Sequence, residues 1–221
     1  WYYNNGVVYS STILDSRVGK VPEKLNTSSL DIEDNCLPIK LVEEKTSDDL
    51  NAVRTLEDLK KLIILNCNCP LKKTAKNIVF SDGNPKANIM FIGEAPGENE
   101  DKTGKPFKGE AGKLLDKMLN AINLSRDNVY ITNVVNYRPP ENRRPTEDEI
   151  NRYLPYITRH IEIIDPKILV LLGSTAMNAL IGNDLVISKA RGSWIQKKFG
   201  ACNTSVIITF HPSFLMRHPC Q

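Results

Sequence analysis

Four short runs of apolar, mostly β-branched residues follow one another along the chain. They cover residues 89–92, 129–132, 168–172 and 205–209. Runs of this length and composition are typical of buried strands. Helical patterns separate the first three runs, and alternating strands and helices indicate a parallel sheet covered on both faces. We therefore expect an α/β fold of three layers, α/β/α, around a central four-stranded parallel sheet.

The segments between these runs carry apolar residues at every third or fourth position, which predicts helices. One is residues 110–124 and another is residues 147–164. The second begins with Thr146 and Glu149 in the spacing of a capping box. A shorter helix is expected after Ser174.

The N-terminal part of the chain has a different character. Residues 1–45 are polar and show no sustained periodicity, so we interpret them as a tail or linker. A helix is plausible from Ser47, because apolar residues then recur along one side: Leu50, Val53, Leu56, Leu59 and Ile63. We therefore expect one folded domain over residues 46–221.

The charge of the chain is unevenly distributed. The formal net charge is only +3, which by itself indicates no particular partner. Residues 1–60 contain 7 Lys and Arg against 11 Asp and Glu, a net charge of −4, so residues 61–221 carry +7. This basic excess in the predicted domain favours an anionic partner.

The cysteines and the length of the apolar runs indicate where in the cell the protein is located. Five cysteines is an odd number, and their irregular spacing argues for a reducing compartment over a disulfide scaffold. No apolar run approaches the length of a membrane span, and no signal-peptide pattern is evident. We expect a cytoplasmic protein that does not contact membranes.

Polar residues and glycines gather where the predicted strands end. The segment "GEAPGENEDKTGKPF", residues 93–107, follows the first strand, and Asn133 follows the second. Gly173 and Ser174 follow the third, and His211 follows the last. In parallel sheets ligands bind beyond the carboxyl ends of the strands. These loops are therefore the candidate site.

Each of these residues also has an ordinary structural interpretation. "GEAPG" could be a tight turn with solvated acids, and Asn133 a cap or turn residue. Phe107 could be a core aromatic, and His211 a hydrogen-bonded loop histidine. "RPPENRRP" could be a rigid connection. Their common position at strand ends favours the functional interpretation.

Three motifs resemble a known family. "GEAPGENEDKTGKPFKGEAG", "VYITNVVNYRPPENRRPT" and "FHPSFLMR" are similar, in sequence and order, to the motifs of the uracil-DNA glycosylase superfamily, closest to family 4. The resemblance runs from about Cys69 to Gln221 and leaves residues 1–60 outside it. Because the family usually continues into a final helix, we expect this chain to be truncated at its C-terminus.

The resemblance implies a catalytic pair. Cleavage of the N-glycosidic bond of deoxyuridine makes the sugar cationic and the departing uracil anionic. Glu94 would hold the attacking water or stabilise the sugar, and His211 would donate to O2 of the leaving base. Glu100 is the next candidate, and the resemblance leaves open which of the two carboxylates is the main one.

The resemblance also implies how the flipped base is bound. Phe107 would stack on it, and Asn133 would read its edge, because an amide can pair with N3–H and O4 together. The backbone amides from Ala95 to Gly97 would contact O2. Glu100 would line the pocket near C5, where a methyl group must be refused.

A further set of residues would contact DNA. Small residues let the backbone approach phosphates closely, and an apolar side chain would fill the gap that the flipped base leaves. The implied residues are Gly173, Ser174, Ser213, Arg217, either Leu215 or Met216 as the wedge, and Arg143 with Arg144 as weaker candidates.

One departure from family 4 concerns its [4Fe–4S] cluster, which four cysteines hold. Here "NCNCPL" keeps Cys69, but Asn66 stands at the first ligand position and Cys67 is out of register. Tyr137 and Tyr153 stand at the third and fourth. Thiolates hold such clusters, so we expect no cluster, no other metal and no cofactor. A cluster on Cys67 and Cys69 is the alternative, with poor spacing.

Two functions from different classes follow from this. The first is a monofunctional, monomeric glycosylase that excises uracil from DNA. The superfamily also includes a variant that bonds covalently to the abasic sugar through a histidine. This variant is disfavoured because "ENRRPTEDE" lacks that histidine and His160 is poorly placed. The second is a DNA-binding or scaffold homologue that kept the fold and lost the chemistry. The intact set of Glu94, Phe107, Asn133 and His211 favours the first.

Overall fold

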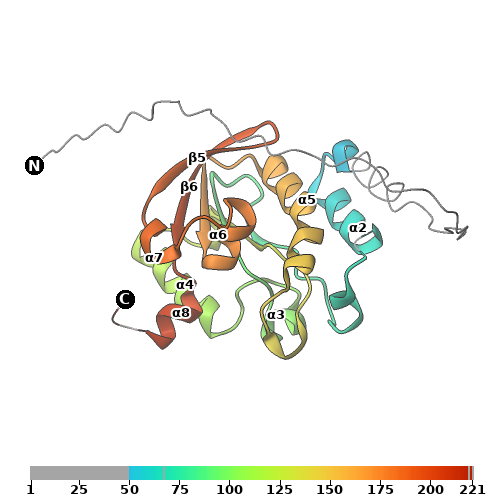
Figure 1. The fold of residues 1–221 in the computed structure, drawn as a ribbon, viewed down its shortest axis with the longest axis horizontal. Helices are drawn as coiled ribbons and strands as arrows, with labels where there is room; N and C mark the ends of the chain where they lie inside the picture. The colour runs from blue at the N-terminus through green and yellow to red at the C-terminus, as the bar shows by residue number, and fades with distance from the viewer. Residues whose placement is uncertain (1–49, 67, 219, 221) are drawn as a thin grey trace, which may run out of the picture. The chain divides into compact units, whose positions relative to one another are not determined.

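The computed structural model describes residues 50–66, 68–218 and 220 (Figure 1). The expected tail over residues 1–45, the domain start at residue 46 and Cys67 lie outside these residues. The first two stay predictions. Within the described part the fold is α/β, as predicted.

The centre of the fold is one six-stranded sheet with the order β1-β3-β2-β4-β6-β5. Its four inner strands are mutually parallel: β3 (Tyr130–Asn133), β2 (Ile89–Gly93), β4 (Ile168–Leu172) and β6 (Cys202–Thr209). They coincide with the four predicted runs. Gly93 pairs with Asn133, and Leu172 with Thr209, so the carboxyl ends of these strands lie side by side.

The prediction of only four strands was incomplete. Two strands run antiparallel at the sheet edges, β1 (Asp82–Gly83) beside β3 and β5 (Trp194–Phe199) beside β6. β1 is too short to produce a pattern. β5 reads "WIQKKF", in which only three of six residues are apolar, because an edge strand with lysines needs little burial and avoids pairing with other chains.

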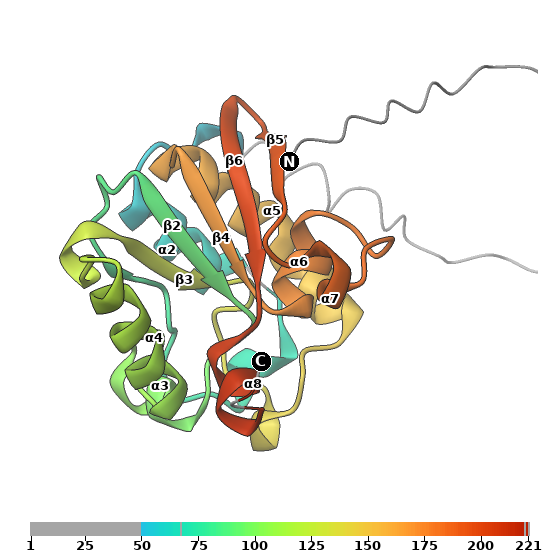
Figure 2. The same cartoon turned by 90° about the vertical axis from the view of Figure 1, so that its left-hand side faces the viewer.

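Helices cover both faces of the sheet. One apolar cluster joins Phe91 and Ile131 to Leu115 and Leu119 of α4 (Glu110–Ala121). The larger cluster packs the other face against α2 (Leu56–Asn66), α5 (Glu147–Ile164) and α6 (Ser174–Leu180). Figure 2 shows these layers on opposite sides of the strands. The three-layer prediction is therefore confirmed.

The remaining helical segments are short and lie near the ends of the strands. They are α3 (Glu98–Thr103), α7 (Ile187–Ala190), α8 (Pro212–Arg217) and the 3-10 turns η1 (Pro70–Lys73), η2 (Arg126–Asn128) and η3 (Pro140–Asn142).

The helix boundaries agree with the sequence pattern for α5, but α4 ends at Ala121 and not at residue 124, and the beginning of the domain also differs. α5 starts at the predicted capping box, where Thr146 N donates to Glu149 and Glu149 N donates to Thr146 Oγ1 at 3.2 Å. The continuous helix expected from Ser47 is interrupted before α2. Thr55 restarts it, because its hydroxyl accepts from Asp58 N at 3.1 Å and caps the new helix.

Among the helices of the described residues, none combines the length and the apolar character that crossing a membrane requires.

Candidate active site

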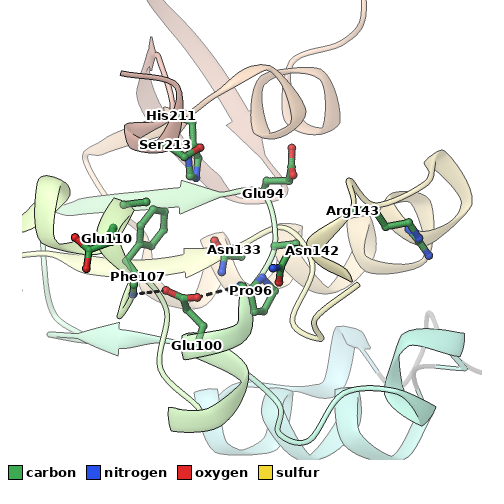
Figure 3. A pocket seen from close by; sticks show the side chains of 14 residues that line it. Glu94, Pro96, Glu100, Phe107, Glu110, Asn133, Asn142, Arg143, His211 and Ser213 are labelled. Atoms are coloured by element: carbon green, nitrogen blue, oxygen red, sulfur yellow. Dashed lines mark hydrogen bonds between the residues drawn. The ribbon is translucent and has the colours of Figure 1, made fainter. Parts of the chain in front are cut away.

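A cavity of about 290 Å³ opens at the carboxyl ends of the parallel strands. All seven residues predicted for catalysis and base binding line it together: Glu94, Ala95, Gly97, Glu100, Phe107, Asn133 and His211. They come from the loops after β2, β3 and β6 (Figure 3). The topology thus brings together residues as far apart in sequence as Glu94 and His211.

Gly93 explains why β2 stops where it does. A Cβ at this position would lie 2.4 Å from Oδ1 of Asn133 and 2.6 Å from Cζ of Phe107. Real side chains do not approach so closely, so only glycine lets the Asn133 amide and the Phe107 ring meet the strand end. The strand therefore ends in a residue that lets two cavity-lining side chains, Asn133 and Phe107, pack directly against its backbone.

Phe107 forms one wall of the cavity in an unusual backbone conformation. Its φ is +54°, a left-handed region that costs a residue with a bulky side chain roughly 1–3 kcal/mol. Its ring is 5 % exposed and lies 5.6 Å from the His211 ring, with an interplanar angle of 28°. The ring is held in place before any ligand arrives.

Asn133 is the last residue of β3 and is 2 % exposed. Its side chain lines the cavity beside Phe107 (Figure 3). An amide offers both a donor and an acceptor, so at this place it can discriminate between the polar edges of planar ligands.

The tautomer of His211 follows from its local contacts. Its Nδ1 accepts from the backbone N–H of Ser213 at 3.2 Å, and the Ser213 hydroxyl lies 2.8 Å from the same nitrogen. A neutral imidazole whose Nδ1 accepts must carry its proton on Nε2. Burial, followed by the charge of Arg217, lowers the pKa of His211 to about 4. The ring is therefore a neutral N–H donor at neutral pH.

Glu94 follows β2 directly and is held by a residue in the first turn of α6. The hydroxyl of Thr175 donates to its carboxylate. Thr175 was not predicted, although a signal existed: β2 and β4 pair side by side, so the first turn of α6 had to lie near the residue after Gly93. The carboxylate is half-buried at the cavity wall, where it can face a cationic group or accept a proton.

Glu100 binds backbone on two sides. One carboxylate oxygen accepts from the N–H groups of Lys108 and Gly109, both at 2.7 Å, and the other accepts from Gly97 N at 3.1 Å. Figure 3 shows it spanning from the turn after Glu94 to the loop after Phe107. Both of its oxygens are thus engaged. The same contact occupies the Gly97 amide, and Pro96 has no N–H, although both residues line the cavity.

A second cavity of about 550 Å³ adjoins the first, because Glu94, Ala95 and His211 line both. Four predicted DNA contacts line it: Gly173, Ser174, Ser213 and Arg217. Gly173 has a φ of +94°, which requires glycine, and packs against Cβ of His211. On α8, Met216 is 47 % exposed and Leu215 is partly buried.

The arginines of the "ENRRPT" loop differ in their surroundings. Arg143 makes a bidentate ion pair with Glu149 of α5, at 2.8 and 2.7 Å. Arg144 lines the second cavity, and Asn142, which was not predicted, lines both cavities. Asn142 also has a positive φ of 56°, a strained conformation that a sequence does not reveal.

The residues at the expected cluster positions do not fit an iron–sulfur cluster. Cys69, Tyr137 and Tyr153 are all buried in the larger apolar core. Cys69 is the only thiol among these three, and phenol groups do not replace thiolates. Within residues 50–66, 68–218 and 220, no group of three or more His, Cys, Asp or Glu side chains could hold a metal ion.

His160 lies in the core away from both cavities. It is 1 % exposed, its Nε2 is 2.8 Å from the Tyr130 hydroxyl, and its ring stacks on Phe80 at 4.6 Å. Its role is therefore structural.

Comparison with known proteins gives one family. Residues 80–221 match the family model described as the uracil DNA glycosylase superfamily. A type-4 uracil-DNA glycosylase of Sulfurisphaera tokodaii is 46 % identical over 170 residues, 75 % of this chain and 77 % of that protein. One of Thermotoga maritima is 43 % identical, over 74 % of this chain and 86 % of that protein. A type-5 uracil-DNA glycosylase of Pyrobaculum aerophilum is 31 % identical, over 45 % of this chain and 50 % of that protein.

Proposed function

The chain belongs to the uracil DNA glycosylase superfamily, and we propose that it flips deoxyuridine out of DNA and hydrolyses its N-glycosidic bond in base excision repair. The enzyme is a monofunctional DNA glycosylase. The observation that carries this proposal is the single cavity lined by Glu94, Phe107, Asn133 and His211.

The extruded base enters the cavity between Phe107 and Asn133. Its flat face stacks on the Phe107 ring, and its N3–H and O4 pair with the Asn133 amide. Gly93 permits this arrangement, because a side chain there would collide with both Asn133 and Phe107 and displace them. Glu100 lines the pocket near C5 of the base and holds the adjoining loop in place. Thymine would need space there for its methyl group.

The sugar side of the reaction is assigned to Glu94. As the glycosidic bond breaks, the deoxyribose becomes cationic, and a carboxylate beside it stabilises that charge and orients a water for attack at C1′. Glu94 is the better candidate of the two carboxylates because both oxygens of Glu100 already accept backbone N–H groups. Thr175 holds Glu94 on its side of the cavity.

The leaving-group side is assigned to His211. Negative charge develops on O2 of uracil as the bond breaks, and the neutral imidazole donates its Nε2–H to this oxygen. Because Ser213 fixes the tautomer, the donor needs no reorganisation during the reaction. The Ala95 amide is the second donor to O2, since Gly97 N donates to Glu100.

The grip on DNA is assigned to the second cavity and its rim. Gly173, Ser174 and Ser213 bring backbone and hydroxyl groups to the phosphates, and Arg217 supplies charge. Arg144 is the better candidate for a phosphate contact than Arg143, because the guanidinium of Arg143 is paired with Glu149. Leu215 or Met216 fills the space that the flipped base leaves.

A uracil-release assay tests the function. The purified protein is incubated with an oligonucleotide that carries one uracil, and the abasic product is cleaved by alkali. We expect product from the uracil strand and none from the thymine control. Stable binding to DNA without release would instead support the alternative, a homologue that kept the fold and lost the chemistry.

We also propose that the enzyme works without an iron–sulfur cluster. Asn66, Tyr137 and Tyr153 at three ligand positions support this. The purified protein should be colourless and contain no stoichiometric iron. A brown protein with about four irons per chain would contradict it, because thiolate-bound clusters absorb visible light.

The partner is uracil-containing DNA, and we propose that the enzyme acts as a monomer. The odd, irregular set of five cysteines supports a reducing compartment, the cytoplasm. Light scattering during gel filtration tests the oligomeric state.

A further inference from the structure

Arg126, which belongs to η2 and lies outside both cavities, makes an unusual number of contacts with the loop that carries Phe107. Its Nη1 donates to the carbonyl of Pro106 at 3.1 Å, and its Nη2 donates to the carbonyl of Phe107 at 2.5 Å. The same guanidinium binds Asp82 and Asp116, each at 2.8 Å. Its side chain is only 17 % exposed. One buried cation thus fixes two successive carbonyl groups.

The next two residues of this loop are fixed by a charge of the opposite sign. The N–H groups of Lys108 and Gly109 both donate to Glu100. Carbonyls 106 and 107 therefore meet a guanidinium, and amides 108 and 109 meet a carboxylate. Charge-assisted hydrogen bonds of this kind are stronger than neutral ones.

Phe107 lies at the centre of these contacts and needs them, because its φ is +54°. A strained conformation persists only where the surroundings determine it. Gly112 in the first turn of α4 adds to this, since a Cβ there would lie 1.8 Å from the Phe107 carbonyl oxygen. Without Arg126, the Phe107 carbonyl would lose its partner and only the N–H side of the peptide would stay bound to Glu100, so the backbone could relax toward an unstrained conformation and the ring would leave the cavity wall.

We propose that Arg126 is a positioning residue for uracil recognition: together with Glu100 it holds Phe107 in the strained conformation that presents its ring to the flipped base. This rests on the proposed function. Arg126 itself contacts neither base nor sugar, and it acts through the backbone of the stacking residue.

The ligand that reports on this role is free uracil, the product, used as an inhibitor. Stacking of a base on an aromatic ring corresponds to a factor of about 5 to 150 in affinity. Arg126→Met removes every donor, and we expect it to raise the inhibition constant for uracil about tenfold. DNA with a reduced abasic site has no base to stack, so its affinity should change less than about twofold.

Two further variants make the test specific. In a Phe107→Ala background, Arg126→Met should weaken uracil inhibition by less than about twofold, because there is no ring left to position. Lys105→Met removes another cation from Asp82 without touching the loop carbonyls, and should leave both affinities unchanged. If Arg126→Met does not fold, Arg126→Lys carries the test, since one ammonium cannot serve both carbonyls and both carboxylates.

The outcomes separate the two hypotheses. If the wild type neither releases uracil from DNA nor binds the free base, the proposed function is wrong. If the wild type does both and a folded Arg126 variant has the wild-type inhibition constant, the inference is wrong. It is also overturned if affinity for abasic DNA falls equally, or if the full effect persists without Phe107, because either result assigns Arg126 to general stability.

Discussion

Replacing His211 with alanine should slow uracil release while leaving DNA binding nearly intact. The substitution removes the Nε2–H that we propose donates to O2 of the leaving base. A single preorganised donor to a developing oxyanion contributes about 2.7–4 kcal/mol to the barrier. We take the lower end, about 2.7 kcal/mol, because the imidazole is neutral, and so expect a loss of about 100-fold in the rate of the chemical step.

The dependence on pH follows from the same environment. Burial and Arg217 lower the pKa of His211 to about 4, so the ring is neutral throughout the range from pH 5 to pH 8. Only as the pH falls through about 4 does Nδ1 gain a proton and lose the hydrogen bond from Ser213 N–H. The contribution of His211 should therefore be constant near pH 6.5, where an unperturbed histidine titrates.

Single-turnover kinetics with enzyme in excess over a uracil-containing oligonucleotide measures the chemical step, and equilibrium anisotropy measures binding. His211→Gln keeps an N–H donor of similar reach and should be intermediate. His218→Ala is the matched control, because His218 is an exposed histidine that packs on Phe214 and lines neither cavity. It should behave as wild type.

Three results would refute this reasoning. Normal cleavage by His211→Ala would remove His211 from the chemistry. A slow rate explained wholly by weak binding would place it in the grip on DNA. A rate inflection near pH 6.5 that disappears in His211→Ala would show that the imidazole titrates normally and is not buried as described.

Glu94→Gln should slow single-turnover release by at least about tenfold, or about 1.4 kcal/mol, with little change in binding, because phosphate contacts supply most of the affinity; wild-type rates would make Glu100 the candidate. Asn133→Asp should weaken uracil excision and shift preference toward cytosine, whose exocyclic amine donates to a carboxylate; unchanged uracil release would exclude Asn133 as the reader. Burial lowers the pKa of His160 to about 3, while the unfolded ring titrates near 6.5. Protonation of the unfolded state should therefore reduce the free energy of unfolding by about 3 kcal/mol between pH 7 and pH 4. Glutamine does not titrate, so urea titrations should show that His160→Gln loses about 3 kcal/mol less free energy of unfolding over this pH range than the wild type does.

The parallel core of the fold could be predicted from sequence because burial on both faces leaves continuous apolar runs. The edge strand β5 could not, since half of its six residues are polar and they do not alternate with the apolar ones. The break before α2 was hidden for a related reason: the apolar repeat continues through it, and a single hydroxyl at Thr55 decides where the helix restarts.

The candidate site divides in the same way. Residues at the end of a strand or directly after it, such as Asn133 and Glu94, could be assigned to the site because topology fixes where strand ends meet. Thr175 and Arg126 act through hydrogen bonds across the fold, and nothing in their local sequence indicates those partners. The ion pair of Arg143 was missed because a loop arginine looks the same whether it faces DNA or Glu149.

Gly93 gives the site a particular evolutionary vulnerability. One added methyl group would collide with both Asn133 and Phe107, two residues that line the cavity. A change of one codon could therefore convert a repair enzyme into a protein that still finds DNA and no longer removes the lesion. In homologues with this fold, the residue at this position is the first to inspect when active glycosylases are to be distinguished from inactive homologues. In the laboratory, Gly93→Ala offers a non-cutting probe with its DNA-binding surface intact.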